Sequence, residues 1–162
     1  MKSYKLYNVL FPMWMLILVP MTWLIVIPAN FIIDSLVLIL AVHFWLKKPI
    51  KEIWKKSIIK VFILGFLSDF VGTGFLLGGI YLAAFTENPV LLNMFENTAN
   101  GPGNIIGFFV LLFAVFLSGI CIYFTDLKIA FKKLDLEISE KKKLALALAV
   151  LTAPYTFFIP LY

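Results

Sequence analysis

Two aspartates interrupt long apolar runs of this sequence, at positions where a charged side chain is costly. Asp69 stands inside the run from Ser57 to Phe85, nine residues after Lys60. At 1.5 Å per residue, this spacing places it about 13 Å along a helix, close to the centre of a bilayer. A carboxyl at that depth normally faces a protein interior or a water-filled cavity, and it often belongs to an ion or solute path.

The residues around Asp69 support a functional interpretation. Small residues and one hydroxyl recur at spacings of three and four, which places them on the same helix face as the carboxyl. They are Gly65, Gly72, Thr73 and Gly79. Gly74 and Gly78 form a small-xxx-small pair on an adjoining face, which permits close helix approach. Two hypotheses follow: Asp69 and Thr73 line a cavity or ion path, or Asp69 is protonated or hydrogen-bonded and only fixes packing against a neighbouring helix.

Asp34 is the second candidate for a solute path, and its setting predicts a different depth. Pro28 suits the first turn of a helix, which would place Asp34 shallowly, near the outer surface. The alternative is that Asp34 interacts with the helix dipole or caps exposed amides with Asn30. His43 lies nine residues further along, about 180° around the helix, so it cannot share one small site with Asp34. We interpret His43 as an interfacial polar residue.

The segment 86–104 carries a second group of polar side chains and no lysine. Carboxylates and amides at an external mouth can bind a hard cation or hydrogen-bond a polar solute, and an ordinary solvated loop is the alternative. The apolar stretch 89–95 has enough surface to lie in the membrane interface or to re-enter the membrane. The candidate outer-loop contacts are Glu87, Asn93, Glu96 and Asn97.

Other chemistry has little support in the sequence. Cys121 is the single cysteine and His43 the single histidine, so no metal-ligand pattern exists and we predict no metal and no cofactor. No hydrolase, zinc-protease or phosphate-loop motif is present. Two intramembrane aspartates invite comparison with an aspartyl protease, but their predicted depths differ by several ångströms and neither stands in such a motif. We therefore predict no catalytic residues.

The composition indicates the elements that must position these side chains. Apolar residues make up 62% of the 162-residue chain and charged residues only 14%, against about 25% in soluble proteins. The apolar runs are long and lack the alternation of a membrane barrel, so they predict an all-α, polytopic transmembrane helical bundle forming a single integral-membrane domain over residues 1–162. All fourteen basic residues are lysine, which argues against nucleic-acid binding and resembles the codon bias of an AT-rich bacterial genome.

We expect about five membrane spans. The first apolar stretch is twice the length of one span, and Ile27–Pro28 supplies a break. A cleaved signal peptide is the competing explanation of the N-terminus, but its apolar core would be too long. The predicted spans are 9–27, 28–46, 57–85, 105–126 and 144–162.

The lysines predict the orientation of these spans. They cluster before the first span, between the second and third, and between the fourth and fifth, so five spans place all three clusters on one side. By the positive-inside rule the N-terminus is cytoplasmic and the C-terminus outside, in a multi-pass protein of the cell membrane. The lysine loops can also attract anionic lipids of the bilayer.

The leading functional hypothesis is a small membrane transport or solute-binding component with a polar stripe on the third predicted helix. Five short spans offer little surface for a pathway, so a homo-oligomer or a partner membrane protein is expected. In this hypothesis Gly65, Gly72, Gly74 and Gly78 serve helix packing. The alternative is a non-transporting accessory protein, such as an immunity, assembly or signalling factor, whose polar stripe is a helix–helix contact.

Overall fold

The computed structural model describes residue 21, residues 23–96, residue 98 and residues 104–159. Its ordered elements are all helices, with no β-strand in the described part of the chain, which confirms the predicted all-α class. Three helical segments there are long and apolar enough to cross a membrane, namely Trp23–Leu46, Ile50–Thr86 and Ile105–Ala130. The count of five spans and the orientation of the termini stay predictions.

The first described helix, α1 (Trp23–Ala41), passes through Pro28 without interruption and continues as the π-helical turn η3 (Val42–Leu46). The predicted break at Pro28 is therefore wrong, and the rest of the predicted first span, residues 9–20 and 22, lies outside the described residues. Proline removes one backbone donor, and membrane helices tolerate this loss where their neighbours compensate. Asp34 is consequently the twelfth residue of the 24-residue segment Trp23–Leu46, at its middle and not near its outer end.

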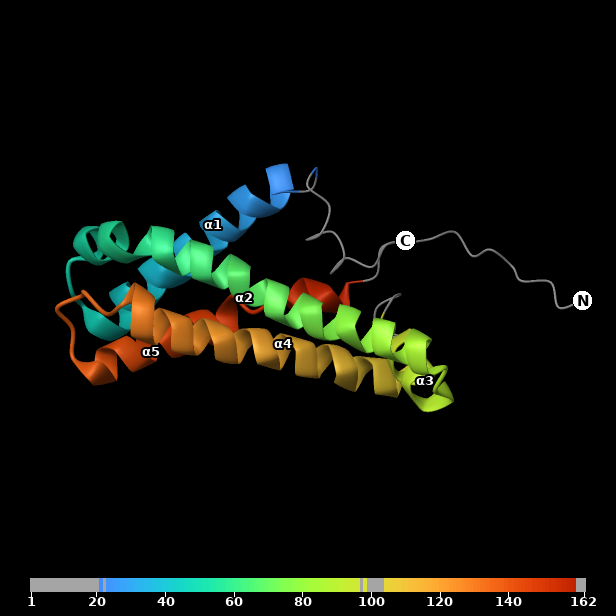
Figure 1. Cartoon of the computed structure of the whole chain (residues 1–162). Coiled ribbons are helices and arrows are strands. Elements are labelled where there is room, and N and C mark those ends of the chain that lie inside the picture. The colour runs from blue at the N-terminus through green and yellow to red at the C-terminus, as the bar shows by residue number, and fades with distance from the viewer. Residues whose placement is uncertain (1–20, 22, 97, 99–103, 160–162) are drawn as a thin grey trace, which may run out of the picture.

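Two long helices make up most of the bundle. Helix α2 (Ile50–Thr86) contains the predicted span 57–85, and α4 (Ile105–Thr125) agrees with the predicted span 105–126 before continuing as the π-helical turn η4 (Asp126–Ala130). They pack side by side along most of their length (Figure 1). The 37 residues of α2 extend about 55 Å, more than the roughly 30 Å hydrocarbon core, so its ends reach beyond the apolar layer or the helix tilts.

The last predicted span does not form one helix. Helix α5 (Ile138–Leu151) begins six residues before the predicted start at Leu144 and ends after fourteen residues, followed by a short 3-10 helix, η5 (Tyr155–Phe158). Pro154 explains the interruption, because it cannot donate to a preceding carbonyl and disfavours helical geometry at the residue before it. The predicted continuous span 144–162 is thus wrong as far as it is described; residues 160–162 lie outside the description.

The two lysine-rich connections lie at the same end of the bundle. Lys48, in the turn before α2, forms a 2.8 Å ion pair with Glu140 in the first turn of α5. The opposite end carries α3 (Pro89–Glu96), a short helix formed by the apolar part of the outer segment and packed against α2 and α4 (Figure 1). Both lysine-rich connections and α3 therefore lie at opposite ends of the described bundle, and which end faces the cytoplasm stays a prediction.

The bundle has an apolar exterior and a partly polar interior. Large apolar side chains such as Phe85, Phe109 and Phe116 are more than half exposed, while several polar side chains are buried. Two apolar cores fill the ends of the bundle, one contributed by α2 up to Val61 and the other from Leu76 onward. The buried polar residues Ser68, Asp69 and Thr73 of α2 lie between these cores.

Candidate functional site

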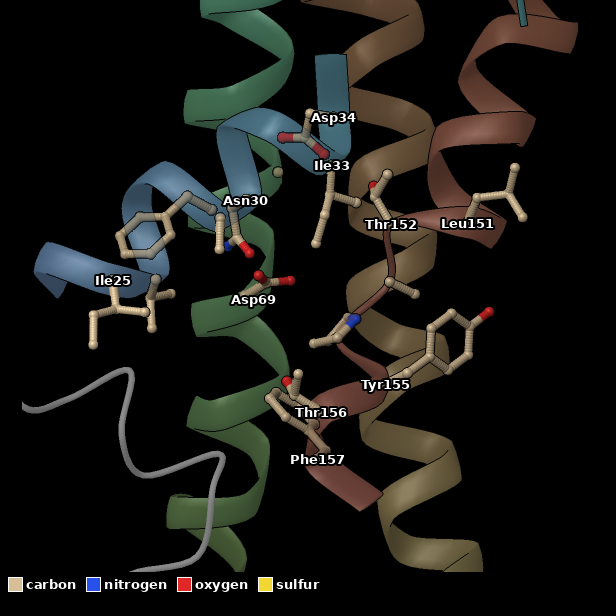
Figure 2. A pocket seen from close by; sticks show the side chains of 16 residues that line it. Ile25, Asn30, Ile33, Asp34, Asp69, Leu151, Thr152, Tyr155, Thr156 and Phe157 are labelled. Carbon is tan, nitrogen blue, oxygen red and sulfur yellow. The ribbon is translucent and has the colours of Figure 1, made fainter. Parts of the chain in front are cut away.

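A cavity of about 350 Å³ opens at this polar layer, between α1, α2 and the interrupted end of α5 (Figure 2). Its size falls in the range of small-molecule sites. Its walls are mostly apolar with a few polar groups. It is lined by Ile25, Val26, Ala29, Asn30, Ile33, Asp34, Gly65, Phe66, Asp69, Leu151, Thr152, Ala153, Pro154, Tyr155, Thr156 and Phe157.

Asp69 reaches this cavity from the middle of α2. Figure 2 shows its carboxyl and the amide of Asn30 pointing into the space between the helices. Only 7% of Asp69 is exposed, and its Oδ1 atom has no hydrogen-bond partner among the described residues. Buried polar atoms are almost always hydrogen-bonded, so a carboxyl that lines a cavity and keeps one oxygen unpartnered indicates a place for water or a ligand.

Asp34 lines the same cavity from α1. Its carboxyl is within hydrogen-bonding reach of the Thr152 hydroxyl, which itself lies 2.9 Å from the carbonyl of Leu148. Because a threonine hydroxyl has one proton, it can donate to only one of these acceptors at a time. A β-carbon built on Gly65 would lie 3.5 Å from Asp34 Oδ2, so the small residue in α2 leaves room for this carboxyl.

The two aspartates form one acidic site, which corrects the prediction that they lie at different depths. Their carboxyls are close enough for their charges to interact. The prediction that Asp34 lies near the outer surface assumes that its helix starts at Pro28. Since α1 begins at least five residues earlier, Asp34 moves to the middle of its helix and faces the inner side of α2.

The predicted stripe continues beyond the cavity as a packing surface. Thr73 is buried, but it does not line the cavity, and its hydroxyl has no partner in the described part of the chain. Gly72 lies against α4 and η5: an added β-carbon would overlap the Ser118 side chain and come within 2.9 Å of both the Ala114 carbonyl and a Phe157 ring carbon. The expectation that Thr73 shares the cavity wall with Asp69 is therefore wrong.

Asp126 is a buried carboxyl that the sequence interpretation missed. It begins η4, is 0% exposed, and neither of its carboxyl oxygens has a hydrogen-bond partner among the residues described. Its charge is close enough to interact with that of Asp34. The predicted fourth span ends at Asp126, and its spacing of four residues from Ile122 and from Ala130 places it on the buried face of α4 and η4.

The interruption after α5 forms the third wall of the cavity. The Thr152 amide donates to the Leu148 carbonyl at 2.8 Å, and the Tyr155 hydroxyl, which points away from the cavity in Figure 2, donates to the Val150 carbonyl. At membrane depth, non-helical backbone is tolerated only where protein buries it or where it lines a water-filled cavity. The carboxyl end of a helix also carries partial negative charge, which adds to that of the two aspartates.

The outer-loop candidates do not reach the cavity. Glu87 ends α2 in a left-handed conformation with φ of 49° and is exposed, and Asn93 is exposed on α3. The side chain of Glu96 and the whole of Asn97 lie outside the described residues. A binding role for these four residues stays a prediction.

Within the described ranges, no group of three or more His, Cys, Asp or Glu side chains is arranged to hold a metal ion. Comparisons with protein family models, curated proteins and solved structures find no match to this chain. The chemistry of the cavity therefore has to be inferred from its own residues.

Proposed function

We propose that this chain is an integral protein of the cell membrane that binds a small solute in the cavity between Asp34 and Asp69 and contributes to its passage. The observation that carries this proposal is the Asp69 carboxyl, which lines a cavity from the middle of an apolar helix and has one buried oxygen, Oδ1, without a hydrogen-bond partner among the described residues. A packing role predicts a hydrogen-bond partner on a neighbouring helix, and the described residues provide none for Oδ1.

The distribution of side chains supports a membrane setting for this cavity. Lipid accepts the exposed phenylalanines and leucines of the exterior, which water would not. Ionisable groups inside such a bundle are expensive, and they commonly line substrate or proton paths. The broken helix beside them is a feature that transporters use at binding sites near the bilayer centre.

A comparison of solute distributions tests the proposal. Cells that express the parent or Asp69→Asn are profiled for small solutes inside and outside, at equal membrane abundance of the protein. We expect at least one solute whose distribution depends on the parent and is lost in Asp69→Asn. Asp135→Asn, which changes an exposed carboxyl, serves as the matched control and should behave as the parent. If every solute has the same distribution in cells with Asp69→Asn as in cells with the parent, the proposed solute pathway must be abandoned.

The proposed orientation places the lysine loops in the cytoplasm. In a Cys121→Ala background, an impermeant thiol reagent should label Glu87→Cys in intact cells and leave Lys133→Cys unlabelled. Both positions are exposed in the structure, so burial does not explain a difference. Labelling of Lys133→Cys alone would reverse the orientation.

A non-transporting accessory role is the second candidate, and the outer face of α2 favours it. Gly74 and Gly78 have no atom within 4 Å of an added β-carbon, so this small-xxx-small face is open for a helix of another chain. In this case Gly74→Leu or Gly78→Leu should remove a co-purifying membrane protein or a second copy of the chain, while Asp69→Asn should not. Solute dependence on Asp69 with no effect of the glycine variants would reject it.

A further inference from the structure

The charge of the cavity has one sign. Two carboxyls, Asp34 and Asp69, face it, and the carboxyl end of α5 adds partial negative charge at Leu151. None of the described residues that line it is Lys, Arg or His. In a site of low dielectric an ionised carboxylate attracts a cation and repels an anion far more strongly than it would in water.

The walls of the cavity favour an apolar body on that cation. Ile25, Val26 and Ile33 of α1 are among the residues that line the cavity, and Leu151 lines it at the end of α5. The rings of Phe66, Tyr155 and Phe157 also line it, and aromatic faces attract ammonium groups, with an energy that grows on desolvation. Phe66 is held in place by edge contacts with Trp23 and Phe70 at centroid distances of 5.9 and 5.3 Å.

The same features argue against a bare metal ion. A Ca²⁺ ion takes six to eight oxygen ligands at about 2.3–2.6 Å. The cavity of about 350 Å³ is much larger than such a coordination shell, and the residues described hold no metal-binding cluster. About a dozen water molecules would occupy this volume at liquid density, which is room for an organic molecule of moderate size.

We infer that the cavity takes a small organic cation, an ammonium group on an apolar body, with Asp34 and Asp69 facing the charge and the aromatic and aliphatic walls covering the body. This inference rests on the proposed function and adds the chemical class of the solute to it. Asn30 and Thr156 supply the remaining polar contacts.

A cysteine placed in the cavity wall tests two claims separately. One is the proposed water-accessible solute cavity, and the other is the inference that its solute is a cation. Ala29 lines the cavity from α1, so Ala29→Cys in a Cys121→Ala background places a thiol beside the site. Its reaction rates in membranes are measured with a neutral, a cationic trimethylammonium and an anionic sulfonate methanethiosulfonate reagent, each divided by its rate with a free thiol. Ile32→Cys, more than half exposed on the outer side of the same helix, is the matched control.

We expect the neutral reagent to reach Ala29→Cys and not Ile32→Cys, and the cationic reagent to exceed the anionic one by on the order of tenfold or more. Adding Asp34→Asn and Asp69→Asn should bring this ratio close to one, with the neutral rate unchanged because the amides keep the cavity shape. Asp135→Asn should leave the ratio as in the parent. Benzyltrimethylammonium chloride should slow the neutral reagent, and sodium chloride at the same concentration should not.

Each failure has its own meaning. A neutral reagent that does not reach Ala29→Cys would reject the water-accessible cavity and with it the proposed function. A neutral reagent that reacts, without a preference for the cationic over the anionic form, would reject only the cation. Equal protection by sodium and benzyltrimethylammonium would replace the organic cation with an inorganic one and overturn the inference.

Discussion

Two sets of glycines on α2 look alike in the sequence and differ in the structure. Gly65 and Gly72 stand on the inner face: an added β-carbon would touch Asp34 Oδ2 at 3.5 Å in the first case and would overlap the Ser118 side chain in the second. Gly74 and Gly78 stand on the outer face, where an added β-carbon would meet no atom of the described residues within 4 Å. Gly72 therefore serves the internal packing beside the acidic cavity, and no other part of the described chain covers the outer pair.

The contrast between the inner and outer glycines shows that a stripe of small residues does not by itself identify a helix contact. What distinguishes the inner face is its polar neighbour Asp69, because burial of a carboxyl requires a protein interior or a cavity, whereas a glycine is tolerated on either side. Substitutions of glycines on the inner and outer faces of α2 test whether the two faces differ in packing.

The largest effect is expected for Gly72→Ala. The new methyl group would overlap the Ser118 side chain and press on the Ala114 carbonyl at 2.9 Å, and this backbone atom of α4 cannot move alone. Overpacking of this kind costs about 1–3 kcal/mol. Thermal unfolding of the purified protein in detergent measures it, with Gly74→Ala as the matched control two residues away.

Gly74→Ala should be neutral or stabilising by about 0.5–1 kcal/mol, because alanine lowers the backbone entropy cost of the helix and the site is open. Equal destabilisation by the two variants would mean that the two faces of α2 do not differ as described.

A smaller loss is expected for Gly79→Ala. Its β-carbon would overlap the ring of Phe95, which is a side chain of the short helix α3 and can shift where a backbone carbonyl cannot. The cost should therefore lie toward the low end of about 1–3 kcal/mol, partly offset by the gain in helix propensity. The same unfolding assay applies, and a loss greater than that of Gly72→Ala would contradict the ranking of the two contacts.

The smallest effect belongs to the half-buried ion pair between Lys48 and Glu140 at the lysine end. A hydrogen bond from the Lys48 ammonium, and then one from the Glu137 backbone, lower the pKa of Glu140 below its ordinary value of 4.5. A lowered carboxyl pKa stabilises the fold above the unfolded value, and this contribution is lost as the pH falls through the folded value. Glu140→Gln keeps the capping interaction with Glu137 but removes the charge.

The parent should therefore be slightly more stable than Glu140→Gln at neutral pH, and unfolding curves recorded at decreasing pH should converge below 4.5. A difference between the two proteins that does not change with pH would assign the effect to the cap and not to the ion pair.

The sequence predicted the long elements well because their signals are local. The apolar runs that became α2 and α4 are long and free of proline, so composition alone defines them. Pro28 and Pro154 show the limit of such signals. One is absorbed inside α1 and the other interrupts the chain after α5, and only the tertiary surroundings distinguish these outcomes.

The candidate site was predicted in part. Asp69 was identified from its depth, and Asp34 from its presence in an apolar run, but their meeting in one cavity depends on the position of α1 across α2, which no local pattern contains. The wall after α5 was missed for the same reason, whereas the buried carboxyl of Asp126 was missed although a local signal existed. The periodic spacing of Asp126 from Ile122 was a usable signal.

The central claim is that Asp34 faces the inner side of α2 at the level of the cavity. Cross-linking tests it directly, because a β-carbon at Gly65 would lie 3.5 Å from Asp34 Oδ2, so the side chains at the two positions are neighbours. In a Cys121→Ala background, Asp34→Cys/Gly65→Cys is oxidised in membranes and the remaining thiols are counted by mass tagging. We expect both thiols of Asp34→Cys/Gly65→Cys to be lost. Both should be retained in the control Asp34→Cys/Leu67→Cys, because Leu67 is 55% exposed on the outer face. Cross-linking of the Leu67 pair without the Gly65 pair would contradict the account.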